Sequence, residues 1–178
     1  MNKSKRNRSA PVEIAWKTLD SFVRFGKIPA AENASEPNDS GLSGRAGCFV
    51  SLKKKGELRG CIGTIAPTTN GIEEEIIRNA VAACSEDPRF DPVETSELED
   101  LTVSVDILGS PEAVSSRTEL DPSCYGVIVT AGFRRGLLLP DLEGVDTVEK
   151  QLAIACRKGG IDPAGAYQIQ RFTVTRYY

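Results

Sequence analysis

Residues 48–63 read CFVSLKKKGELRGCIG, and this stretch decides the fold. Two runs that alternate between apolar and polar side chains flank a short Lys–Gly segment, which is the pattern of a β-hairpin. A three-residue loop at 54–56 separates the two faces most cleanly, because Gly56 then takes the left-handed conformation. This loop predicts that Phe49 is the cross-strand neighbour of Cys61.

The same register assigns each side chain of the second strand to a face. The core-facing side is expected to hold Leu58, Gly60 and Ile62. The opposite face is expected to hold Glu57, Arg59 and Cys61. Glycine weakens a strand, because it supplies no side chain and loses more backbone entropy than other residues. Glycines on both sides of Cys61 therefore indicate a place where a ligand or another chain approaches the backbone closely.

The segments around the hairpin have clear periodicities. Apolar side chains at helical spacing predict helices at 12–25 and 71–86, and strict alternation at 101–108 predicts a half-buried strand. Residues 29–46 are rich in Pro, Asn, Ser and Gly and are expected to form a surface loop. The glutamates at 73–75 fall in the first turn of the second helix, where the helix dipole favours negative charge, and are expected to form a solvated face.

The second half of the chain repeats this plan. A hairpin at 125–140, a helix capped by Thr147 and a final strand at 167–178 follow one another. The apolar positions of the final strand change parity near 170–171, which predicts a β-bulge.

The two halves also align by number. Arg59-Gly60 recurs as Arg135-Gly136, 76 residues later, and apolar helix positions repeat at the same offset. This predicts a duplicated hairpin–helix–strand unit, at about 47–109 and 125–178, in a mostly antiparallel α+β protein whose helices cover one side. The basic residues at 1–10 are expected to form a disordered tail before a single domain at 11–178.

The bulk composition excludes several classes of function. The 178 residues suit one domain or two small lobes, and a net charge of −3 argues against a nucleic-acid binder held by phosphate contacts. No apolar stretch approaches the roughly 20 residues that span a bilayer. The five cysteines form no CxxC pair, so a reducing, cytoplasmic location is expected. There is no histidine, which removes Cys–His and Ser–His–Asp catalysis and the commonest metal ligand. No metal or cofactor is expected.

Cys61 is the sharpest candidate for chemistry. In the predicted register Arg59 shares its face, and a nearby positive charge favours a thiolate. The alternative is that Cys61 only packs, because free cysteine is among the most buried residue types.

Two arginine-containing turns offer further candidates. Asp87, Arg89 and Asp91 bracket a proline-stiffened turn, where an Asp–Arg pair either fixes the loop or holds an anionic ligand. Arg134 and Arg135 lie at the tip of the second hairpin and can bind an anion or simply be solvated.

Four motifs, in this order, resemble the AMMECR domain family. They are LRGCIGT at 58–64, DPRF at 87–90, RRGLLLP at 134–140 and RFTVTRYY at 171–178. The resemblance covers about 12–178. It implies an antiparallel, barrel-like sheet, internal duplication, two unequal lobes and a functional cleft lined by LRGCIG, but no established reaction.

The resemblance also implies roles and partners. Candidate ligand-binding residues are Gly60, Gly63, Thr64, Asp87 and Arg89. Prokaryotic relatives are associated with a MEMO-like protein and a radical SAM enzyme, and this chain contains no CxxxCxxC iron–sulfur motif. It therefore resembles the stand-alone accessory member of that system.

Three functional hypotheses follow. The first is a binding or accessory protein whose LRGCIG cleft holds a small anionic ligand or a segment of a partner. The second is an enzyme or redox protein that uses Cys61 as a thiolate, with Arg59 as its electrostatic activator. The third is a purely structural interaction module.

Overall fold

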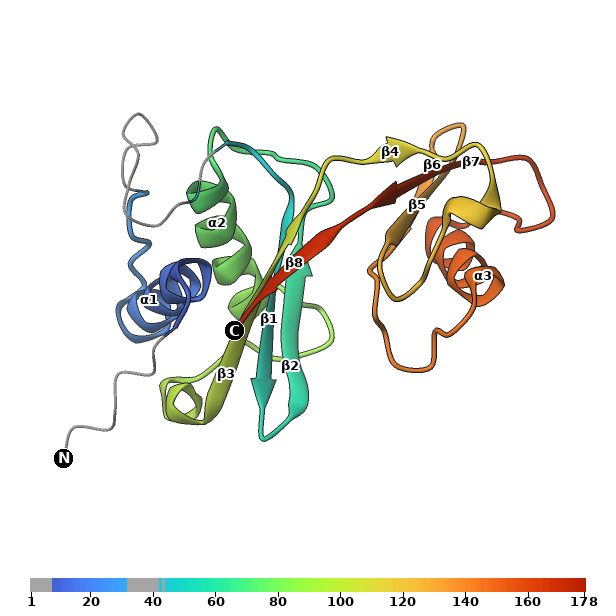
Figure 1. Ribbon diagram of the computed structural model, residues 1–178. Coiled ribbons are helices and arrows are strands. Elements are labelled where there is room, and N and C mark those ends of the chain that lie inside the picture. The colour runs from blue at the N-terminus through green and yellow to red at the C-terminus, as the bar shows by residue number, and fades with distance from the viewer. Residues whose placement is uncertain (1–7, 32–41, 43) are drawn as a thin grey trace. The chain divides into compact units, whose positions relative to one another are not determined.

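The computed structural model describes residues 8–31, 42 and 44–178, and it shows a mixed α+β protein (Figure 1). Its helices are α1 (Ala10–Phe25), α2 (Ile72–Ser85) and α3 (Val148–Gly159), with short 3-10 helices η1 (Thr95–Asp100) and η2 (Arg117–Glu119). Its strands are β1 (Cys48–Lys54), β2 (Glu57–Gly63), β3 (Leu101–Leu108), β4 (Glu112–Ala113), β5 (Gly126–Ala131), β6 (Arg134–Leu138), β7 (Gln168–Phe172) and β8 (Val174–Tyr177).

The predicted tail and first loop lie partly outside the described residues. Residues 1–7, 32–41 and 43 are not described. The last part of the predicted tail is ordered, because Arg8 lies over the Trp16 ring at 4.3 Å and α1 already begins at Ala10.

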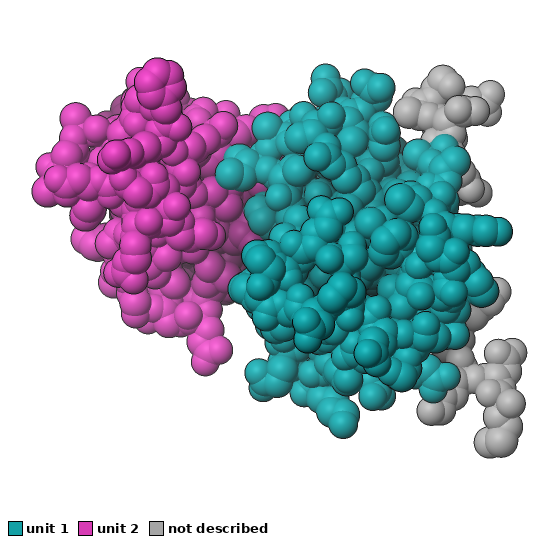
Figure 2. Space-filling view, turned by 180° about the vertical axis from the view of Figure 1, so that it is seen from behind, with its two compact units in different colours: residues 1–107, 176–178 teal, residues 108–175 magenta. Residues whose placement is uncertain are grey.

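The chain divides into two compact units of unequal length, residues 1–107 with 176–178 and residues 108–175 (Figure 2). The first sheet has the order β2-β1-β3-β8 and lies mostly in unit 1, although residues 174–175 at the start of β8 are assigned to unit 2. The second sheet has the order β4-β7-β5-β6. The mostly antiparallel character is confirmed, since β1 pairs antiparallel with β2 and β3, and β5 does so with β6 and β7. Closure into a barrel and the single-domain boundary stay predictions.

The two units follow one plan. In each, a hairpin is followed by a helix and then by a third strand that pairs with the first strand of the hairpin. The fourth strand of each sheet then follows the third strand of the other: β4 comes after β3 but pairs with β7, and β8 comes after β7 but lies beside β3.

This exchange corrects the predicted bulge in the last strand. The parity change is the boundary between β7 and β8, which belong to different sheets and are separated by Thr173. Phe172 is buried against Gly126 at the end of β7, and Val174 begins a strand with other neighbours. Because β7 and β8 belong to different sheets, the apolar side chains of the two strands face different cores.

Each unit has its own hydrophobic core on the helix side of its sheet. In unit 1, α1 and α2 lie on one side of the sheet (Figure 1). The inner side chains of β1, Cys48, Val50 and Leu52, are fully buried and pack with residues of both helices. In unit 2, Val127 and Val129 of β5 pack with the buried face of α3. Gly26 and Gly160 end α1 and α3 in the left-handed conformation, as helix C-caps commonly do.

The register of the first hairpin differs from the prediction. Lys55 and Gly56 both have positive φ and form a two-residue turn, so Lys54 pairs with Glu57 and Cys61 pairs with Ser51 rather than Phe49. Such a turn matches the twist of the strands better than a three-residue loop. A bulge opposite positions 52 and 53, with Arg59 as the extra residue on β2, then places Gly60 opposite Leu52.

The bulge changes the faces only near the turn. Gly60 and Ile62 lie opposite Leu52 and Val50, so their core-facing assignment is confirmed. Leu58 pairs with Lys53 and is 41% exposed, so its core-facing assignment was wrong. The extra residue of the bulge absorbs the one-residue mismatch that the two-residue turn creates.

Candidate functional site

Cys61 lies in a row of small nucleophilic side chains across the sheet of unit 1. Ser51 is the cross-strand partner of both Cys61 on β2 and Ser104 on β3. The row occupies the face away from α1 and α2, because the neighbouring Val50 and Leu52 point into the core. Ser51 Oγ donates to Cys61 Sγ at 3.2 Å, and all three side chains are half-buried. The sequence indicated the alternation of β1 and β3 but not which serine meets the cysteine.

Asp87 and Arg89 hold the backbone of Cys61. β2 is the edge strand of its sheet, so its outward N–H and C=O groups need partners. The Cys61 N–H donates to Asp87 Oδ2 at 2.9 Å, and the Cys61 carbonyl accepts from Arg89 Nη2 at 3.3 Å. Arg89 Nη2 also lies 2.6 Å from Asp87 Oδ2. The Asp–Arg pair therefore acts as a short substitute for a further strand.

The charges of this pair are strongly coupled. Hydrogen bonds from Arg89 lower the pKa of the nearly buried Asp87 carboxyl far below its usual range, against the effect of burial. The same contact raises the pKa of Arg89. The Arg89 side chain is 54% exposed, so its remaining donors are open to solvent or to a ligand. The predicted turn-fixing role is present, and ligand binding by this pair stays a prediction.

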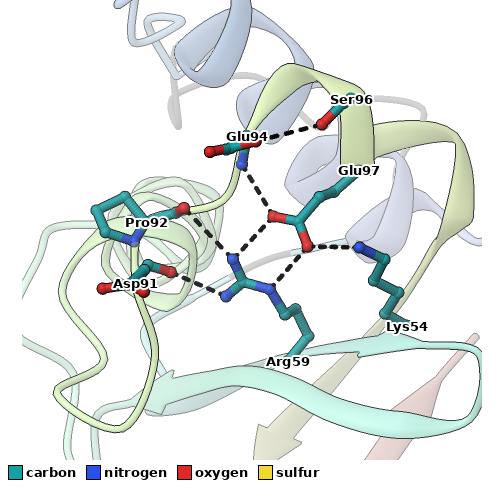
Figure 3. Close-up of polar contacts among 7 residues, drawn as sticks. All are labelled: Lys54, Arg59, Asp91, Pro92, Glu94, Ser96 and Glu97. Atoms are coloured by element: carbon teal, nitrogen blue, oxygen red, sulfur yellow. Dashed lines mark hydrogen bonds and ion pairs between the residues drawn. The ribbon is translucent and has the colours of Figure 1, made fainter.

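The guanidinium of Arg59, the extra residue of the bulge, is held by the 91–97 segment of unit 1 (Figure 3). Its Nε and Nη2 donate to the two carboxylate oxygens of Glu97 at 3.0 and 2.8 Å, and Lys54 Nζ contacts the same carboxylate at 2.8 Å. Arg59 Nη1 and Nη2 also donate to the carbonyls of Asp91 and Pro92. Hydrogen bonds from Arg59 hold the pKa of Glu97 at about 2. The contacts of Arg59 thus tie the 91–97 segment to the hairpin, while Arg89 is the arginine that reaches Cys61.

The two predicted ligand-binding glycines have close neighbours of their own. A Cβ on Gly60 would collide with the Ala83 carbonyl of α2, so this glycine lets helix and strand pack closely. A Cβ on Gly63 would collide with the Phe49 ring on the neighbouring strand. Both glycines are required by packing, and ligand contact at either stays a prediction.

Thr64 leads to a buried carboxylate that the sequence analysis placed wrongly. Glu75 is fully buried rather than part of a solvated face. Its carboxylate accepts from Thr64 Oγ1 and from the backbone N–H and hydroxyl groups of both Thr68 and Thr69. Burial alone would raise the pKa of Glu75, but these hydrogen bonds outweigh it and hold the pKa at about 2. Three threonines just before an acidic first turn were the available signal.

A pocket of about 740 Å³ adjoins this network in unit 1. Ile62, Gly63 and Thr64, the end of the LRGCIG segment and its next residue, form part of its wall. The apolar side chains in the lining include those of Ile28, Pro29, Ile62, Ile77 and Val81, and the charged ones are Glu74, Arg78 and Glu86. Its size lies within the range of ligand sites.

The described residues contain neither a cluster of metal ligands nor a membrane-spanning helix. Within residues 8–31, 42 and 44–178, no group of three or more Cys, Asp or Glu side chains is placed to hold a metal ion. In the same part of the chain, no helix combines the length and apolar character that crossing a membrane requires.

Fold and site define an α+β protein of two similarly connected units, with a glycine-containing edge strand held by an Asp–Arg pair. The AMMECR1 family model matches residues 12–178, and the chain belongs to this family. A Thermotoga maritima protein is 52% identical over 168 residues, which are 93% of this chain and 95% of that protein. A Clostridium acetobutylicum protein is 49% identical over 175 residues, which are 98% of this chain but only 37% of that longer protein. The crystal structure of an uncharacterized protein from Pyrococcus horikoshii matches with a TM-score of 0.83 and 29% identity, over 94% of this chain and 89% of its own.

Proposed function

We propose that the protein is a cytoplasmic accessory protein that binds a segment of a partner in the unit 1 pocket next to LRGCIG. The observation that carries this proposal is the pocket of about 740 Å³ whose wall includes Ile62, Gly63 and Thr64. Its mixed lining suits a peptide-like segment better than a small anion, because Arg78 shares the pocket with two carboxylates, Glu74 and Glu86.

The pocket wall is firmly held. Thr64 is bonded to Glu75 and also accepts from Asn79 Nδ2 at 3.2 Å, and both of these partners are buried. In β2, which leads to Thr64, Gly60 packs against α2, and the Asp87–Arg89 pair binds the outer edge of the strand. A preformed wall lowers the entropic cost of binding.

The partners we propose are a MEMO-like protein and a radical SAM enzyme. Family membership supports this choice. The Clostridium acetobutylicum relative also contains the matching region within a much longer protein, so this type of domain occurs together with other sequence in one chain.

Co-purification with a tagged MEMO-like protein and, separately, a tagged radical SAM enzyme tests the proposal. Ile28 lines the pocket and is 57% exposed, so Ile28→Glu should keep the fold and weaken capture at least about tenfold. Phe25→Glu is the matched control, because Phe25 is 68% exposed and lies outside the pocket lining. Equal capture of both variants and the wild type, or capture of neither partner by the wild type, would exclude the proposal.

A second candidate function, thiol chemistry at Cys61, is favoured by one observation. The thiol is half-buried on the helix-free face, within hydrogen-bond reach of Ser51. Cys124 is exposed, so its replacement by Ser leaves Cys61 as the accessible thiol of the described residues. In that background, the iodoacetamide rate of Cys61 below pH 7 should exceed that of a free thiol. A rate no higher than the free thiol would exclude this candidate.

A further inference from the structure

A second pocket, of about 830 Å³, lies within unit 2. It is formed by the segment at 113–117, by Thr130 of β5, by Arg135 of β6 and by the segment at 165–170. Arg135, Thr130 and Gln168 are aligned across β6, β5 and β7 by their pairing. This row lies on the face opposite α3, because the neighbouring residues of the same strands pack into the α3 core.

Arg135 is exposed and has no hydrogen-bond or ion-pair partner among the described residues. Its counterpart 76 residues earlier is Arg59, and each arginine immediately precedes a glycine that packs against the helix of its unit. Glu97 neutralises Arg59, whereas no residue does so for Arg135 in the described part of unit 2. Arg59 is thus held in an ion pair within unit 1, whereas the equivalent Arg135 of unit 2 is available to bind an anion.

A second guanidinium lines the same pocket. Arg117 donates from Nη2 to the Tyr167 hydroxyl at 3.2 Å, and it has no carboxylate partner among the described residues. Tyr167 is half-buried, packs against the α3 core and is neutral at pH 7, because burial raises the pKa of its hydroxyl above the ordinary value. The Arg117 side chain is therefore oriented by one hydrogen bond and keeps further donors free.

The rest of the lining is neutral and rich in hydrogen-bond donors. The polar groups are the hydroxyls of Ser115, Ser116 and Thr130 and the amides of Gln168 and Gln170. None of the described lining residues is acidic. The two carboxylates nearest along the chain, Glu112 and Glu119, already have partners: Glu112 pairs with Arg171 at 3.3 Å, and Glu119 accepts from the N–H groups of Ser115 and Ser116. Two arginines with neutral donors and no lining acid form an environment that attracts anions.

We propose that this unit 2 pocket binds a small organic oxyanion, a molecule whose phosphate or carboxylate group contacts Arg135 beside Thr130 and Gln168, while Arg117 adds positive charge from another part of the lining. Guanidinium groups bind both oxyanions through paired N–H donors. The organic part of the ligand contacts the aliphatic parts of the Gln168 and Gln170 side chains, which share the face of Thr130. The volume accommodates a molecule of metabolite size. This site is separate from the partner-binding pocket of unit 1.

Two aryl anions, phenyl phosphate and phthalate, distinguish the two charged groups. Binding to the full chain is measured by calorimetry and by amide NMR shifts, which locate the site. At least one probe should bind with a Kd below about 10 mM and shift the amides of the pocket segments. The tighter probe identifies the preferred oxyanion. If neither probe binds below this concentration, or if the shifts fall outside unit 2, the proposal is wrong.

Adjacent arginines supply a matched pair of variants. Arg135→Gln should weaken the tighter probe at least about tenfold, because a charge-assisted hydrogen bond is lost. Arg134→Gln removes the same charge from the neighbouring position, but Arg134 binds the Gly160 carbonyl and does not line this pocket, so its Kd should change less than about twofold. Equal weakening by both variants would show only general charge attraction and would overturn the site. Thermal unfolding of both variants confirms that they fold.

Discussion

The two units have the same order of elements, but equivalent buried positions in their helices make different hydrogen bonds. Position 75 holds a fully buried Glu, and its counterpart 76 residues later is Gln151, also fully buried. Glu75 accepts five hydrogen bonds from the threonines at 64, 68 and 69. Gln151 donates one bond to the Tyr125 carbonyl at 2.8 Å, and its Oε1 has no partner among the described residues.

This difference shows which features the two units share. Backbone packing is retained in both units, because Gly60 and Gly136 each let a strand approach its helix. The charges are not retained, since unit 1 has bound carboxylates at Glu75 and Glu97. Unit 1 therefore uses Glu75 and Glu97 to hold its own segments, whereas Arg117 and Arg135 of unit 2 have no carboxylate partner among the described residues.

Exchanging the buried side chains should produce the largest effect. Gln151→Glu places a carboxylate in a buried site where the one hydrogen-bond partner of the side chain among the described residues is an acceptor, the Tyr125 carbonyl. We expect unfolding in urea at pH 7 to require about 4 kcal/mol less than for the wild type, because a charge without donors is costly to bury. Gln151→Met, which keeps the volume, should lose only about 1 kcal/mol. The deficit of the Glu variant should shrink at pH 5 as its carboxyl protonates; a constant deficit would point to a steric cause.

The shared glycine packing can be tested by adding one methyl group to each unit. A Cβ on Gly136 collides with the Ala155 carbonyl and comes within 2.9 Å of the Gly159 nitrogen. Gly136→Ala should therefore destabilise by about 3 kcal/mol, and Gly60→Ala by somewhat less. Gly56→Ala is the control, because nothing lies within 4 Å and only its positive φ, 91°, costs about 1 kcal/mol. Urea unfolding that ranks Gly56→Ala with the other two would contradict this packing role.

The fold was more predictable than the site, for physical reasons visible at particular residues. Helix and strand positions follow from local periodicity, and the predicted duplication rests on Arg-Gly pairs that indeed pack alike. The hairpin register could not be predicted from local alternation, because the bulge at Arg59 makes a two-residue turn compatible with apolar pairing, and Arg59 is held by Glu97, 38 residues away.

Long-range contacts also explain the other errors. Glu75 reads as a solvated helix residue until the loop threonines close over it. The break at Thr173 reads as a bulge until the two strands are assigned to different sheets. Periodicity encodes neither of these contacts, although the threonines before the acidic first turn were a signal for the first. The sequence indicated an Asp–Arg pair at 87 and 89, but it did not indicate that this pair binds the backbone of Cys61.

The low pKa of Glu75 predicts an acid sensitivity that unit 2 lacks at the equivalent position. The folded-state pKa, about 2, is below the ordinary value of 4.5, so this stabilisation is present above about pH 5 and is lost as the pH falls toward 2. Between pH 6 and pH 3 the wild type should lose about 2 kcal/mol more than Glu75→Gln. Trp16, the one tryptophan, reports on unit 1 by fluorescence.

The control for this prediction is Glu149→Gln. Glu149 lies in the first turn of α3 and is exposed. Its replacement should leave the pH dependence of unfolding close to that of the wild type. A Glu75→Gln protein with the same acid sensitivity as the wild type would show that the threonine network does not set the pKa.

The smallest expected effect concerns the two hairpin turns. The first left-handed turn position is Lys55 in unit 1, with φ 54°, and Gly132 in unit 2, with φ 56°. A lysine pays about 1 kcal/mol for this conformation, whereas glycine adopts it freely and asparagine tolerates it. Lys55→Asn should therefore raise the free energy of unfolding by about 0.5–1 kcal/mol, and Gly132→Ala should lower it by about 1 kcal/mol. Urea unfolding measures both variants. Destabilisation by Lys55→Asn would contradict this prediction and would show that the turn of unit 1 depends on the lysine side chain.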